Sequence, residues 1–249
     1  MTGTSAIDEV VAQLQALLDG MAEEPPERVA GRRPFLETYL RTTRAVGDAV
    51  RDGVFEDPAW VEQWDVAFAE LYVDALTAHQ EGRPTPRPWR LAFEASSEIH
   101  PLGHVLLGVN AHINYDQPQS LLRVMPPGDF EDPEVMARRH RDHEAIDAVL
   151  NRRVAAEGRE FDGQSLLDRA LTPANRAGTR RFLRESRRKV WHNTHELHAS
   201  RLAGPEVFER RLAELEVLAA ARIADLLEPG LVLLRLAVGG FGVRLPPPA

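Results

Sequence analysis

Residues 100–116, HPLGHVLLGVNAHINYD, place three histidines and an aspartate within an apolar segment that has the composition of a buried helix. Its apolar residues are Leu102, Val105, Leu106, Leu107, Val109 and Ile113. A buried polar side chain needs a hydrogen-bonding or metal partner, because leaving it without one costs roughly 1–3 kcal/mol. His112 and Asp116 stand four residues apart, so on a helix both project from the same face. The stretch therefore predicts a buried helix that carries a polar site.

Apolar residues at helical spacing continue on both sides of this stretch. Asp57-Pro58 and Asp132-Pro133 are typical helix openings, with aspartate as the N-cap and proline in the first turn. The expected helices cover residues 5–20, 35–51, 58–81, 89–99, 100–116, 134–156, 172–202 and 205–228, and residues 117–132 are expected to form a loop rich in Pro, Gly and Asp.

This pattern predicts an all-α fold, a single-domain bundle of about seven or eight helices over residues 1–249. Residues 1–33 would form a peripheral N-terminal helix and loop, and residues 231–249 an apolar tail that ends in prolines. The tail cannot be assigned to helix or strand from its periodicity.

The composition limits the classes of protein and partner. The formal charge of -8 comes from interleaved acidic and basic residues, which argues against binding to nucleic acid or to an anionic membrane surface. The absence of cysteine excludes disulfides, thiolate metal sites and cysteine catalysis. The chain opens without a signal-peptide pattern, and none of its runs reaches the roughly 20 apolar residues of a membrane span. We therefore expect a cytoplasmic protein without a membrane partner.

The histidines are unevenly distributed. Eight of the nine lie between His100 and His198, and four histidines have a carboxylate four residues later: His112/Asp116, His140/Glu144, His143/Asp147 and His192/Glu196. Such pairs on packed helices can converge on a metal ion, and a chain without cysteine would hold Zn, Mn or Fe through nitrogen and oxygen. The resulting hypothesis is a metal-dependent hydrolase of a small ester, amide or phosphoester.

In this hypothesis each residue has a stated role. The metal ligands would be His104, His112, Asp116 and His143. His195 would be a further ligand or catalytic group, and Asp147 or Glu196 would orient a ligand or act as general base. The site is expected inside the bundle, because each of the four ligands belongs to an apolar helix face.

Three other interpretations stay open. Asn110, His112, Asn114 and Asp116 could form a buried polar network that is purely structural. The same region could be a metal-free pocket for a small molecule, with Trp89, Tyr115 and Trp191 as its walls and histidines as acid–base groups. His198 is a further candidate for a structural or pocket role. A protein-interaction module would use the first amphipathic helix or the apolar tail. A small molecule is the expected partner, and a homodimer is left open.

One motif carries a resemblance to a known family. Residues 109–118, VNAHINYDQP, resemble the NAHINYDLP-type motif of an uncharacterised, largely actinobacterial family of helical proteins, a domain of unknown function (DUF5995). Gln117 stands where that family usually has leucine. The resemblance extends over most of the chain and implies a single helical domain built around Asn110, His112, Asn114 and Asp116, without implying an activity.

Overall fold

All regular structure in the described part of the chain is helical. The computed structural model describes residues 5–160, 166–228, 240 and 242–248, with side chains described except at 147 and 150–184. When the continuous run Pro101–Val124 is counted once, eight of the described helices have seven residues or more. The predicted all-α bundle of about seven or eight helices is therefore confirmed.

The helices follow one another with short connections. Their bounds are α1 Ala6–Gly20, α2 Pro26–Val29, α3 Arg33–Arg51, α4 Pro58–Gln80, α5 Arg87–Phe93, α6 Pro101–Ala111, the π-helix η1 His112–Asp116, α7 Gln117–Val124, α8 Pro127–Glu131, α9 Pro133–Glu160, α10 Leu166–Ala203 and α11 Pro205–Leu227. None of the described helices is long and apolar enough to span a bilayer.

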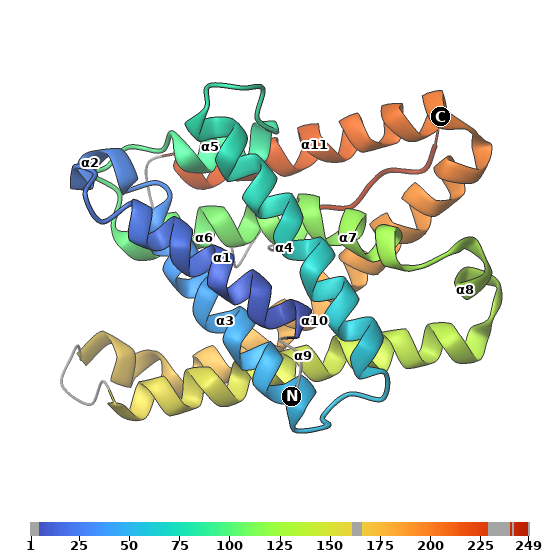
Figure 1. Ribbon diagram of the computed structural model, residues 1–249, viewed down its shortest axis with the longest axis horizontal. Coiled ribbons are helices and arrows are strands. Elements are labelled where there is room, and N and C mark those ends of the chain that lie inside the picture. Colours follow the sequence, from blue (N-terminus) through green and yellow to red (C-terminus); the bar gives the residue numbers. More distant parts are fainter. Residues whose placement is uncertain (1–4, 161–165, 229–239, 241, 249) are drawn as a thin grey trace.

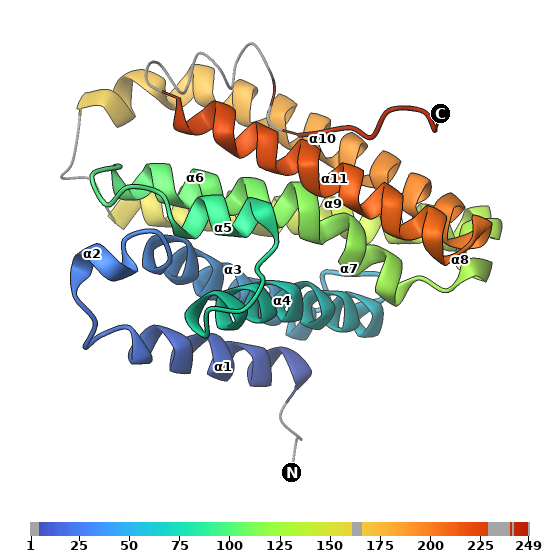
Figure 2. The ribbon, with the colours of Figure 1, turned by 90° about the horizontal axis from the view of Figure 1, so that it is seen from above.

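The run from α6 through η1 to α7 lies in the middle of the molecule. Helices α3 and α4 pack on one side of this run, with α1 covering them from outside, and α10 and α11 pack on the opposite side (Figures 1 and 2). Helix α5 contacts both α6 and α11, and α9 packs on α3. The stretch from which the sequence predicts a buried helix is therefore the centre of the bundle.

The predicted helix openings are present in the structure. The Asp57 carboxylate accepts the backbone N–H of Trp60 at 3.1 Å, and Pro58 is the first residue of α4. At α9 the Asp132 carboxylate accepts the N–H groups of Glu134 and Val135, at 2.9 and 3.2 Å. Both aspartates satisfy backbone donors that the first helical turn leaves without a partner.

Three sequence-based boundaries were wrong. The helix expected over 89–99 begins at Arg87 and ends at Phe93, and the helix expected from residue 172 begins at Leu166. Residues 117–132, expected to be a loop, contain α7 and α8. Pro118 lies in the first turn of α7, directly after η1, and Leu121 and Leu122 bury the helix against its neighbours. The Pro and Gly content of this segment therefore predicted a loop where burial of leucine side chains stabilises a helix.

The π-helix η1 is the unusual feature of the central run. Gln117 donates its backbone N–H to the carbonyl of His112, five residues earlier. Pro118 lacks an N–H, and in a regular α-helix its ring would clash with the carbonyl of Asn114. The wider π turn accommodates that proline, and π turns are frequent at functional sites.

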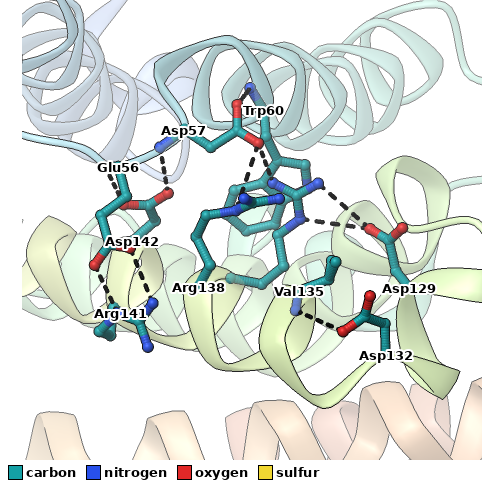
Figure 3. A network of polar contacts seen from close by, with 10 residues as sticks. Glu56, Asp57, Trp60, Asp129, Asp132, Val135, Arg138, Arg141 and Asp142 are labelled. Atoms are coloured by element: carbon teal, nitrogen blue, oxygen red, sulfur yellow. Dashed lines mark hydrogen bonds and ion pairs between the residues drawn. The ribbon is translucent and has the colours of Figure 1, made fainter.

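A network of charged side chains attaches α9 to the loop before α4 (Figure 3). The buried Asp142 carboxylate accepts the backbone N–H groups of Glu56 and Asp57, at 2.7 and 2.9 Å. Arg139 pairs with Asp57 at 2.6 Å and lies 4.6 Å from the centre of the Trp60 ring. These bonds hold α9 in position beside α3 and α4.

The described part of the C-terminal tail, Gly242–Pro248, lies along α10 and crosses to the central run. Asn193 donates to the Val243 carbonyl at 3.0 Å and accepts the N–H of Leu245 at 2.9 Å. Asn114 accepts the N–H of Val243 at 3.1 Å, and the Leu245 side chain is fully buried. The tail is therefore part of the packed structure.

Candidate functional site

A cavity of about 200 Å³ lies beside the central run, between α3, α4, α9 and α10. Its apolar walls are Phe35, Tyr39, Val46, Trp64, Phe68, Val109, Ile113 and Ile146, and its polar side chains are Thr38, Thr42, Asp65, His112, Gln117, His143, Ser186 and Arg187. The cavity opens at its partly exposed residues, which are Thr38, Thr42, Phe68, Val109, Ile113, Ile146 and Arg187. Mostly apolar walls with a few polar groups are typical of small-molecule sites.

His112 and Asp116 form a hydrogen-bonded pair at the inner end of this cavity. Nδ1 of His112 lies 2.8 Å from Oδ2 of Asp116, and the indole N–H of Trp89 donates to the same oxygen at 2.8 Å. Because that oxygen accepts from Trp89 as well, we assign the imidazole proton to Nδ1, which donates to Asp116. Nε2 of His112 is then an acceptor, and it has no hydrogen-bond partner among the described residues.

Aromatic rings surround His112. The Phe68 ring stacks on the imidazole with 3.5 Å between centroids, and the Tyr39 and Phe35 rings meet it edge-on at 4.6 and 5.7 Å. Burial lowers the pKa of His112 well below its usual value and raises the pKa of Asp116 well above its usual value. The environment therefore keeps the imidazole neutral at physiological pH.

Two more polar atoms are buried at the cavity wall without a partner. The Tyr39 hydroxyl and Oδ2 of Asp65 have no hydrogen-bond partner among the described residues, and these side chains are 6% and 8% exposed. Burial, reinforced by the charge of Glu62, raises the pKa of Asp65 to about 7. Buried polar groups are normally satisfied, so unsatisfied ones on residues that line a cavity make it a candidate site for a ligand or ordered water.

His143 reaches the same cavity from α9. The indole N–H of Trp191 donates to its Nδ1 at 3.1 Å, so the proton of the neutral ring is on Nε2. That nitrogen lies 3.0 Å from Nε2 of Gln117, and because both atoms would be donors we assign the Gln117 amide in the flipped orientation, with its oxygen as the acceptor. Burial, helped by the charge of Arg187, lowers the pKa of His143 to about 3. Both ring nitrogens are therefore used, and neither presents a lone pair to the cavity.

The structure brings together only part of the predicted metal ligand set. His112 and Asp116 touch, and His143 lines the same cavity, whereas His104 is buried on α6 and is not among the cavity walls. Among the side chains that the structure describes, which leave out 147 and 150–184, no group of three or more His, Asp or Glu is placed to hold a metal ion. A metal would require His143 and Asp116 to leave their present partners, so metal binding stays a prediction from the sequence.

The predicted catalytic residues lie elsewhere. His195 is exposed, with its ring edge-on to Phe130 at 5.4 Å, and Glu196 pairs with Arg211 at 2.7 Å. Neither lines the cavity, and the side chain of Asp147 lies outside the described residues. A role for His195 or Glu196 beside His112 therefore has no geometric basis in the described residues.

The residues predicted as structural or pocket groups are mostly structural. Asn114 donates to Oδ1 of Asn110 at 3.1 Å and holds the tail, and Tyr115 packs against α10 and α11. His198 stacks on the Phe130 ring at 3.8 Å. Trp191 positions His143 without lining the cavity. The predicted polar network at Asn110 and Asn114 therefore exists and connects the central run to the C-terminal tail.

Sequence reasoning missed Tyr39, Asp65 and Gln117 as site residues. Asp65 follows Trp64 within the apolar stripe of α4, three residues before Phe68. A carboxylate in an apolar stripe is the same signal that marks His112 and Asp116. Gln117, the position at which the sequence departs from the resembled motif, contacts His143 in the cavity wall.

Comparison with known proteins supplies a family without an activity. The model of a family described as "Family of unknown function (DUF5995)" matches residues 7–229. Neither the search of curated proteins nor that of solved structures returned a match. Because the match covers most of the chain, this protein belongs to the DUF5995 family.

Proposed function

We propose that this protein binds a small, mostly apolar molecule that carries a hydrogen-bond donor, without using a metal. The observation that supports this proposal is that His112, Tyr39 and Asp65 line one cavity with aromatic walls, and that each carries a buried side-chain atom without a hydrogen-bond partner among the described residues. An engineered cavity of roughly 150 Å³ accommodates benzene, so about 200 Å³ suits one ring with a short substituent.

The hydrogen bonding of the wall favours binding over acid–base catalysis. His112 presents an acceptor nitrogen, but burial lowers its pKa so far that it is a weak base near neutral pH. Asp116 fixes the ring orientation and its tautomer, as a carboxylate does for many buried histidines. His112 is therefore suited to accept a hydrogen bond from a ligand, and the protein would act as a binding or carrier protein.

Calorimetric titration with two neutral probes tests the proposal. Toluene matches the apolar walls, and benzyl alcohol adds a hydroxyl donor that Nε2 of His112 can accept. We expect both to bind, benzyl alcohol about fivefold more tightly, which corresponds to one hydrogen bond of about 1 kcal/mol. In His112→Phe this preference should disappear while toluene still binds.

A filling substitution provides the control. Thr42 lines the cavity mouth, so Thr42→Phe should abolish binding of both probes, whereas Thr77→Phe, at a partly exposed threonine of α4 outside the cavity, should leave it unchanged. Absence of binding to the wild type would overturn the proposal. Metal analysis of untagged protein examines the competing hydrolase hypothesis, which predicts one Zn, Mn or Fe per chain and loss of thermal stability with a chelator.

A further inference from the structure

Asp65 lines the cavity and has a buried carboxyl group that forms no ion pair with the described residues. Its side chain is 8% exposed, and the described residues offer it neither an ion pair nor a hydrogen bond at Oδ2. The nearest charge that affects it is another acid, Glu62, one turn earlier on α4. An ionised carboxylate in such a place costs several kcal/mol unless it gains a proton or a cation.

The other charged residue of the cavity lining, Arg187, donates to Glu144 at 3.2 Å. Asp116, which lies behind His112 and outside the lining, accepts hydrogen bonds from the neutral His112 ring and from Trp89. Asp65 is therefore the acid of the lining to which the described residues offer no cation. A ligand that carried a positive charge to this place would supply one.

Aromatic rings adjoin Asp65 in the cavity wall. Trp64 and Phe68, from the same helix as Asp65, stack on each other at 6.2 Å, and the Tyr39 ring meets Phe68 edge-on at 6.3 Å. Trp64 also stacks on Trp60, and Phe68 on His112, so these faces are occupied by other rings. The rings therefore supply an apolar wall, and the selection of an amine rests on the Asp65 carboxyl group.

Resting on the proposed function, we infer that the ligand is a small primary amine bearing one ring or a short apolar chain, with its ammonium group against Asp65. Two further N–H groups of such an ammonium could reach the Tyr39 hydroxyl and Nε2 of His112, both of which lack partners among the described residues. A carboxylate ligand would instead be repelled by Asp65, and Arg187 is engaged with Glu144. The cavity should therefore discriminate by the sign of the charge.

Binding should strengthen as Asp65 ionises. The groups that face it are Glu62 on α4, Tyr39 on α3, His112 and Asp116 on η1, His143 on α9 and Arg187 on α10. Burial keeps both histidines neutral and, with the charge of Asp65, raises the pKa of Tyr39, so His112, His143 and Tyr39 do not titrate near pH 7. Burial also raises the pKa of Asp116 well above its usual value. With the pKa of Asp65 at about 7, the ionised fraction, and with it the affinity for an amine, should rise about tenfold from pH 6 to pH 8.

Three probes of matched size test the inference by calorimetry at pH 8: benzylamine, benzyl alcohol and benzoate. We expect benzylamine to bind at least tenfold more tightly than benzyl alcohol, and benzoate not to bind. Asp65→Asn should remove the preference for benzylamine and its dependence on pH while benzyl alcohol still binds. Asp74 is an exposed aspartate on the same helix, so Asp74→Asn should change neither the preference for benzylamine nor its dependence on pH.

The outcomes separate the two proposals. If benzyl alcohol binds and benzylamine binds no better, or if Asp65→Asn retains the preference, the amine inference is wrong and the binding function stands. If benzoate binds best, Arg187 selects the ligand and the amine inference is again wrong. If none of the three binds, the proposed function itself fails.

Discussion

Asp65→Asn should stabilise the protein at pH 8 and much less at pH 5. Burial raises the pKa of the Asp65 carboxyl from 3.8 to about 7, so over this interval the native state retains a proton that the unfolded state has lost. Stability is therefore lost as pH rises through this window. Since one pKa unit corresponds to about 1.4 kcal/mol, the loss is about 4 kcal/mol by pH 8 and about 1.5 kcal/mol at pH 5.

Urea unfolding followed by circular dichroism measures this difference. Asparagine has nearly the same shape as aspartate and carries no charge. The free energy of unfolding of Asp65→Asn should therefore exceed that of the wild type by an amount that grows by about 2–3 kcal/mol from pH 5 to pH 8. Asp74→Asn serves as the exposed control and should show no such growth. An Asp65→Asn protein with the same relative stability at both pH values would refute the argument that Asp65 is buried without a cation.

Three further substitutions probe the structure. Gly108→Ala should cost about 1–3 kcal/mol in urea unfolding, because its Cβ would lie 2.4 Å from a ring atom of Phe35; Gly20→Ala, with open space, should not destabilise. Asp142→Ala should cost about 1–3 kcal/mol, since two backbone N–H groups lose their acceptor; a change within 0.5 kcal/mol would contradict the role of the network in Figure 3. Asn193→Ala should speed hydrogen exchange and proteolysis in residues 242–248, and unchanged protection there would show that other contacts hold the tail.

Repeated patterns made the fold predictable from the sequence. The helix openings at Asp57 and Asp132 and the apolar stripes after them are local signals, and the structure confirms the helices that they predict. Helix α7 was missed because its formation depends on burial of Leu121 and Leu122 in the bundle, which local composition does not reveal.

The site was predictable only around its centre. His112 and Asp116 do pair, because their spacing on one helix fixes their proximity. The partners from other helices depend on packing: Asp65 and Tyr39 reach the cavity, whereas His195 and Glu196 project elsewhere on α10. A histidine-rich segment thus indicated chemistry at residues 192–198 where the structure shows ring stacking and ion pairs.

The π turn makes the cavity depend on the number of residues in the central run as well as on their identity. A π turn contains one more residue than an α turn, so deleting one residue between 112 and 116 would allow regular α-helix to form. Everything after the deletion would rotate by about 100° around the helix axis, which would turn Gln117 away from His143 and α7 away from α4 and α10. Related sequences that lack one residue between 112 and 116 would therefore keep the composition of the buried run but lose the binding site. The length of this turn would then serve as a sequence marker for the presence of the site.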